Sequence, residues 1–252
     1  SNYLYDKENL SLVITIISML LAIYFSSRVE RQEQVFKGDS STFKQVFEQF
    51  TQIKENPLIR NFIFYAFIWT CLSTALWFFQ LEIINNFTND SAVKTQIFGR
   101  ADSIVPIITL ATQLLLTSYF LRSKYLGIRF VLTMYGVLFT VAFFAVSGYF
   151  SEYLLSASGI TLFLILQGTM RPFEYGLNKP AREAVFTTLS TKEKYKSTVF
   201  IDTFTNRFGD ATGGLLFNSL LSFGLLLYAA PLAIIPLAIF LINLGWSISK
   251  DI

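Results

Sequence analysis

The chain has 252 residues, of which 53% are hydrophobic and only 15% are charged, and its formal net charge is +3. Ordinary soluble domains carry about 25% charged residues, and a soluble fold has no means of hiding several uninterrupted apolar runs of about 18 to 22 residues from water. The composition therefore excludes a soluble globular domain. It predicts an all-α polytopic membrane protein, a helical bundle in contact with a lipid bilayer.

The N-terminal part of the chain predicts one membrane-spanning helix followed by a linker. Residues 1–27 contain the first span, whose uncharged run covers 10–27. Residues 28–60 are polar and are expected to form a cytoplasmic linker. Apolar side chains recur in it at helical spacing, which predicts an amphipathic helix on the membrane surface, with a solvated linker helix as the alternative. These side chains are Phe43, Val46, Phe47 and Phe50.

Residues 61–252 are predicted to form a six-helix transmembrane bundle, which gives seven transmembrane helices in all. Ala211 to Ser249 is a run of 39 residues without a charge. One crossing needs about 20 residues, so this run barely suffices for two crossings and the first of them must begin before Ala211. In chain order the six expected spans are 62–81, 103–121, 130–151, 153–170, 197–221 and 230–249.

The distribution of positive charge predicts the topology. Of the 20 Lys and Arg residues, 16 fall in alternate connections, namely 28–60, 122–129, 171–196 and the C-terminal tail. The positive-inside rule assigns this set to the cytoplasm. We therefore expect the N-terminus of the chain outside and the C-terminus inside.

Polar side chains on the predicted spans give the first set of candidate site residues. Charged groups within a membrane are costly and usually face the bundle interior or a watery cavity, and polar groups at a spacing of 3.6 residues share one helix face. Arg207 and Asp210 are three residues apart, so they are also placed to form an ion pair. The predicted substrate-binding or translocation path consists of Asp202, Asn206, Arg207, Asp210, Gln113, Asp102 and Gln80.

A second charged set lies toward the predicted cytoplasmic end, between the fifth and sixth of the seven predicted spans. Two interpretations stay open: gating ion pairs that break and re-form during alternating access, or a static network that fixes the helix ends. The set consists of Arg171, Glu174, Lys179, Arg182, Glu183 and Lys196. Nearby, Gly213 and Gly214 are expected to allow close helix packing rather than to bind a ligand.

The order of the elements is that of part of a two-repeat transporter. One span, a long basic linker and six further spans match the last helix of a first half, the central loop and the second half. The basic loop 122–129 lies where major facilitator proteins carry a basic, glycine-containing motif between the second and third helices of a half. It has the glycine and three basic residues but not the usual aspartate.

The charged stretch carries a more specific resemblance. Residues 174–189, 194–196 and 201–214 resemble the corresponding region of the ATP/ADP translocase family, and resemble its bacterial major-facilitator-like relatives more closely. In the translocases a Lys-Glu pair stands at Arg182-Glu183, a Lys-x-Lys at Lys194-Tyr195-Lys196, and Asp and Arg at Asp202 and Arg207. This chain has Asp210 where the translocases have a lysine, which weakens the case for a polyphosphate ligand.

The resemblance implies a secondary transporter of the major-facilitator type that works by alternating access in a bacterial cytoplasmic membrane. The implied substrate is a nucleotide such as ATP or ADP, or another organic anion, and the implied partner is a missing N-terminal half. No cofactor, metal cluster or nucleic-acid partner is indicated, and no nucleophile stands with a base, so an enzyme is not expected. The alternative from another class is a non-transporting, transporter-like membrane scaffold or sensor.

Overall fold

The structure is a computed structural model that describes residues 17, 20–21, 56–122, 126–151 and 159–250. The chain divides into two compact units, Ser1–Thr42 and Phe43–Ile252. In the first unit Ile17, Leu20 and Leu21 are helical and exposed. The rest of the predicted first span and the predicted surface helix at 43–50 lie outside the described residues.

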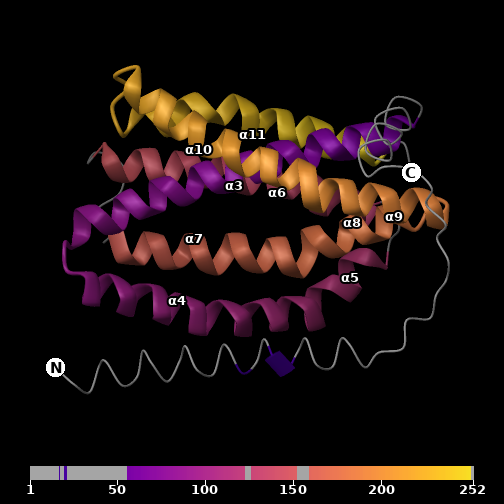
Figure 1. Ribbon diagram of the computed structural model, residues 1–252, viewed down its shortest axis with the longest axis horizontal. Helices are drawn as coiled ribbons and strands as arrows, with labels where there is room; N and C mark the ends of the chain where they lie inside the picture. The colour runs from indigo at the N-terminus through magenta and orange to yellow at the C-terminus, as the bar shows by residue number, and fades with distance from the viewer. Residues whose placement is uncertain (1–16, 18–19, 22–55, 123–125, 152–158, 251–252) are drawn as a thin grey trace. The chain divides into compact units, whose positions relative to one another are not determined.

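The described part of the second unit is all-α (Figure 1). Its helices are α3 (Pro57–Phe87), α4 (Ser91–Thr112), η1 (Gln113–Thr117), α5 (Ser118–Leu121), α6 (Leu126–Phe150), α7 (Gly159–Phe173), η2 (Glu174–Asn178), α8 (Lys179–Phe186), α9 (Thr191–Phe200), η3 (Ile201–Thr205), α10 (Asn206–Ser222) and α11 (Ala229–Ile248). The three η segments are π-helical. Each of them joins its two neighbours into one continuous helix.

The expected number of seven membrane spans is wrong for the structure described. Six long helices form the bundle, α3, α4, α6, α7, α10 and α11, and within the described residues four helices are long and apolar enough to cross a membrane. These four are Pro57–Phe87, Ser91–Leu121, Gly127–Phe150 and Ala229–Ile248. They give the protein the character of a multi-pass integral membrane protein.

The two other long helices fall short of that standard for different reasons. α10 carries Arg207 and Asp210 and several further polar residues, which lower the mean hydropathy of the helix that contains it. α7 is described over 15 residues and then continues into the polar segments η2 and α8. Counting apolar residues overlooked both effects, because a helix enclosed by other helices tolerates polar side chains that a lipid-facing helix does not.

Close helix packing organises the interior of the bundle. α6 packs against α11, α3 packs against both α10 and α11, and α4 packs against α7. A Cβ atom at Gly213 would overlap the backbone oxygen of Cys71 on α3, and one at Gly245 would lie 2.8 Å from the backbone oxygen of Leu132 on α6. Small residues are typical where membrane helices approach this closely. The packing role expected of Gly213 is therefore confirmed.

The two ends of the bundle differ in charge. Figure 1 shows the α3–α4 and α10–α11 connections at one end, and the α8–α9 connection with α5 at the other. At this second end Ser190 and Glu193 form a capping box that starts α9. The basic residues Arg60, Arg122 and Lys194 lie near helix termini of this second end, so the described connections alternate as the charge pattern predicts.

The continuous helix Ser91–Leu121, made of α4, η1 and α5, is the least enclosed of the candidate spans, since 6% of its apolar segment is buried, against 61% for α3. Its outer face exposes Ile107, Leu114 and Leu115. Its polar side chains Asp102, Gln113 and Thr117 contact residues of α7 and η2 instead. This division is the one expected of a helix with one face toward lipid and the other toward protein.

Candidate functional site

A polar recess of about 210 Å³ lies between α3, α6 and α7. Gln80 of α3 and Gln167 of α7 meet in it, the Gln167 amide nitrogen donating to the Gln80 oxygen over 2.5 Å. Both side chains are buried, and the Gln167 oxygen has no hydrogen-bond partner among the described residues. The recess is lined by Ser73, Leu76, Trp77, Gln80, Tyr135, Phe139, Gln167, Met170, Arg171 and Glu174.

Glu174 is the carboxylate among the described residues that line this recess. The Tyr135 hydroxyl donates to its Oε2 over 3.2 Å, and Lys179 Nζ lies 3.6 Å from its Oε1. The Lys179 ammonium also lies 3.9 Å from the centroid of the Tyr175 ring. The hydroxyl donor and the cation stabilise this carboxylate, whose side chain is 19% exposed.

Arg171 is the cation of the recess. Its Nη1 lies 2.7 Å from Asp102 Oδ1 on α4, and the two side chains are 44% and 66% exposed. Two of the predicted site residues thus form a contact that ties α4 to α7. Because the pair is exposed, it is an exchangeable contact rather than a locked one.

The segment η2 depends on side chains from η1. Pro180 has no amide N–H. An N–H at position 180 would donate to the Tyr175 carbonyl in a π-helix and to the Gly176 carbonyl in an α-helix, so neither carbonyl receives this hydrogen bond. Gln113 Nε2 donates to the Tyr175 oxygen over 3.1 Å, and the Thr117 hydroxyl donates to the Gly176 oxygen. Gln113, a predicted path residue, therefore stabilises the backbone next to Glu174.

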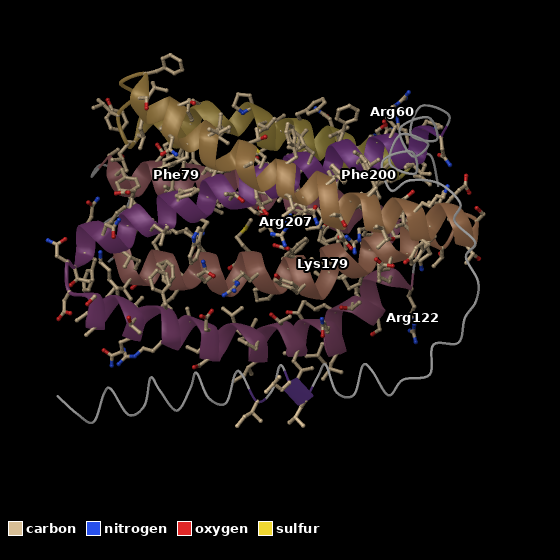
Figure 2. All side chains as sticks on the ribbon, in the orientation of Figure 1. Arg60, Phe79, Arg122, Lys179, Phe200 and Arg207 are labelled. Atoms are coloured by element: carbon tan, nitrogen blue, oxygen red, sulfur yellow. The ribbon has the colours of Figure 1, made fainter. Side chains whose placement is uncertain are left out.

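The predicted stripe on α10 faces α3. The Thr70 hydroxyl donates to Asn206 Oδ1 over 3.2 Å, and the Thr74 hydroxyl donates to Asp210 Oδ1 over 2.8 Å. Arg207 Nη1 lies 3.7 Å from Asp210 Oδ2, as the spacing predicted, and its side chain is 81% exposed. Figure 2 shows the Arg207 and Lys179 side chains in the region between α10 and the helix that contains α7 and α8.

A network of ion pairs connects α8, α9 and η3. Arg182, whose side chain is 9% exposed, lies 2.7 Å from Asp202 and 3.1 Å from Glu183. Lys194 extends the network to Glu183 over 3.7 Å, and Asn206 donates to Asp202 over 3.3 Å. Lys196 was expected in this set, but it is half-buried on α9 and takes part in no ion pair within the described part of the chain.

Three side chains near these groups were not expected from the sequence: Tyr65, Asn178 and Tyr135. The hydroxyl of Tyr65 lies 2.9 Å from Asn178 Oδ1 and 3.1 Å from the Leu132 backbone oxygen, and Tyr135 contacts Glu174. Both tyrosines lie within apolar runs, where an aromatic ring is ordinarily part of the core. A tyrosine hydroxyl that faces a polar helix is visible only once the helices are packed.

The structure thus distributes the predicted residues over two groups. Gln80, Arg171 and Glu174 line the recess; Asp102 and Lys179 contact the lining residues Arg171 and Glu174, and Gln113 contacts the backbone of Tyr175 beside Glu174. Asp202, Asn206, Arg182 and Glu183 form the network between α8 and α10, and Asp210 and Arg207 lie further along α10. In the described residues no group of three or more carboxylate, Cys or His side chains is placed to hold a metal ion.

Comparison of the chain with protein-family models, with curated proteins and with solved structures finds no match in any of the three. The resemblance to nucleotide translocases therefore stays a prediction from the motifs quoted from the sequence, and the chemistry of the site rests on the geometry of the recess.

Proposed function

We propose that this chain is part of a secondary transporter of the major-facilitator type, which carries an organic anion across a bacterial cytoplasmic membrane by alternating access. Nucleotides are candidate substrates because of the motifs shared with ATP/ADP translocases. On this proposal the chain works together with a further half of the transporter, and its basic end faces the cytoplasm.

The observation that carries the proposal is that Arg171 and Gln167 line the same recess. The Arg171 guanidinium is held by an exposed carboxylate of α4, Asp102, which an anionic ligand is able to replace. The buried Gln167 oxygen without a partner then offers an acceptor to a hydroxyl or amino group of the same ligand. Ligand sites in proteins combine apolar walls with a few such placed polar groups.

Exposed ion pairs between helices support the alternating-access part of the proposal. Asp102–Arg171 and Glu183–Lys194 each join two different helical segments through side chains that are 38% to 66% exposed. Exposed ion pairs exchange partners at little cost, which suits helices that change their relative positions. Within the described residues the recess is lined by one cation, Arg171, and one carboxylate, Glu174, which favours a small organic anion over a nucleotide polyphosphate among the candidate substrates.

The proposal is tested by transport in liposomes that contain the complete protein, using labelled nucleotides and small mono- and dicarboxylates. Arg171→Gln should raise the KM for the transported anion at least tenfold, because a charge-assisted contact contributes roughly 1.5–3 kcal/mol. Arg171→Lys should recover part of this loss. Arg100→Gln, a change of an arginine on the helix that also carries Asp102, is the matched control.

Three outcomes contradict the proposal. If Arg171→Gln and Arg100→Gln transport alike, Arg171 does not bind the substrate. If only neutral or cationic solutes are carried, the substrate class is wrong. If no solute of the panel is carried although the protein is folded, a scaffold or sensor is favoured over a transporter.

A further inference from the structure

A second cavity lies away from the polar recess, where the ends of three candidate membrane spans meet. It has a volume of about 710 Å³ and is bounded by α5, the first turns of α6 and the last turn of α11. In the part of the chain that the structure describes, its lining consists of four aromatic residues, one glycine, two arginines and one threonine. The residues are Tyr119, Phe120, Arg122, Gly127, Arg129, Phe130, Thr133 and Trp246.

The polar part of this cavity is cationic. Arg129 lies over the Trp246 ring, with its Cζ 2.9 Å from the ring centroid. Its Nε is buried and has no hydrogen-bond partner among the described residues. An arginine carries five N–H donors and no acceptor, and a buried donor without an acceptor is destabilising. The group that completes this site must therefore supply acceptor oxygens.

The remaining polar groups narrow the choice of ligand. Arg122 on the rim is exposed and adds a second positive charge. The Thr133 hydroxyl already donates to the backbone oxygens of Arg129 and Phe130, so it serves the helix rather than a ligand. No carboxylate occurs among the described residues that line the cavity. Two cations with no internal counter-ion fit a phosphate oxyanion, which arginine recognises with paired N–H donors.

The apolar part of the cavity indicates that this phosphate belongs to a lipid. The rings of Phe120 and Phe130 stack with centroids 5.0 Å apart. Tyr119 and Trp246 are 71% and 48% exposed at the ends of helices that are apolar enough to span a membrane. Exposed Trp and Tyr at helix ends are typical of the membrane–water interface. A free phosphate ion would leave these rings uncovered, whereas acyl chains would cover them.

We propose that this cavity binds one anionic phospholipid from the leaflet at the basic end of the bundle. Its phosphate lies between Arg122 and Arg129, and its acyl chains cover Phe120 and Phe130. Basic pockets between membrane helices are known to hold acidic headgroups by the same physics. The bound lipid would fix the end of α6 against α11, independently of any ligand in the polar recess.

The test uses the full chain purified in detergent and exposed to an equimolar mixture of phosphatidylglycerol and phosphatidylcholine, with bound lipid counted by native mass spectrometry. The parent should retain more phosphatidylglycerol than phosphatidylcholine. Arg129→Gln should lower this ratio about tenfold, the loss expected for one charge-assisted contact. Arg60→Gln is the matched control, because Arg60 is an exposed arginine at the same end of the bundle (Figure 2).

Should Arg129→Gln fail to accumulate, Arg122→Gln carries the test, because the Arg122 side chain is exposed; this change should also lower the ratio. The proposal is overturned if the parent shows no preference for phosphatidylglycerol, or if Arg60→Gln lowers the ratio as much as the arginine variants of the cavity. Displacement of the lipid by millimolar inorganic phosphate or glycerol 3-phosphate would overturn it in favour of a site for free phosphate.

Discussion

Asp210 illustrates how a single contact changes the interpretation of a charged residue. An intramembrane carboxylate suggests a ligand or a proton path. In the structure one of its oxygens accepts a hydrogen bond from Thr74 and the other lies near Arg207. The carboxylate thus has partners within the chain, and its place on the translocation path stays a prediction. Arg171, whose partner Asp102 is on an exposed helix, is the stronger candidate for ligand contact.

Gly213→Ala should destabilise the protein by roughly 1–3 kcal/mol, because the added methyl group overlaps the Cys71 backbone on α3 and neither helix can yield easily. Gly214→Ala is the control. There the methyl group would meet the Phe78 ring at 3.3 Å, and alanine favours a helix by about 1 kcal/mol over glycine. Thermal unfolding in detergent measures both variants; equal melting temperatures would show that α3 and α10 are not in close contact.

The pair Arg182–Asp202 should show a coupling free energy of about 0.5–3 kcal/mol in a double-mutant cycle with Arg182→Gln and Asp202→Asn. The reason is that the Arg182 side chain is 9% exposed and its contact with Asp202 is 2.7 Å long. The pair Arg207–Asp210 is the control. Its contact is 3.7 Å long and the Arg207 side chain is 81% exposed, so its coupling should lie near the roughly 0–1 kcal/mol of surface pairs. The reverse order would contradict the burial described for the network.

At the level of helices, the π-helical segments carry two of the charged side chains. η2 contains Glu174 and η3 contains Asp202, and each interrupts a longer helix. A π-helical turn inserts one residue into the helical repeat and therefore rotates all later residues of that helix. Polar side chains nevertheless meet the same neighbour on both sides of a junction, since Asp102 on α4 and Gln113 on η1 both contact the helix that contains α7 and η2. Across the junction between η3 and α10, Asn206 donates to Asp202.

Thr117→Val should destabilise the protein by about 1 kcal/mol, the usual contribution of one hydrogen bond, because the Gly176 oxygen loses the hydroxyl that serves it. In the Pro180→Ala background the cost of the same change should shrink, since position 180 then supplies a backbone donor. Thr109→Val serves as the control. Its hydroxyl donates to Val105 of its own helix, so its loss should matter little in either background.

Chemical denaturation measures these effects in the three single variants and in the two double variants that combine a threonine change with Pro180→Ala. An equal cost of Thr117→Val with and without Pro180 would show that the proline does not create the need for the η1 hydroxyl.

Over the bundle as a unit, the segregation of charge to the two ends is the feature that the membrane imposes. The α8–α9 connection at one end and the α3–α4 connection at the other are separated by the lengths of α3 and α4 (Figure 1). Lys and Arg are retained on the cytoplasmic side during insertion. The alternation of the described connections therefore leads to a prediction about sidedness.

Single cysteines at Asn89 and Thr187, in a Cys71→Ser background, should react with a membrane-impermeant thiol reagent from opposite sides of the membrane. Both positions are exposed in connections at opposite ends of the bundle. Asn89 should be labelled in intact cells and Thr187 only after lysis, because its end is the basic one. Labelling of both positions in intact cells would contradict the proposed topology, whereas the reverse assignment would contradict only the positive-inside argument.

The amino-acid sequence alone predicts the all-α membrane character of this protein, the positions of its apolar helices and the pairing of Arg207 with Asp210, whereas the helices Pro57–Phe87 and Ser91–Leu121 extend beyond the expected spans 62–81 and 103–121. These features follow from local quantities: the length of an apolar run and the spacing of residues on one helix. The packing of the folded bundle gives the contacts of Arg171 with Asp102, of Tyr135 with Glu174 and of Gln113 with the η2 backbone. Each joins residues that are at least 39 positions apart. No periodicity encodes such contacts, since they depend on how helices cross and on the rotation that a π-helical turn introduces.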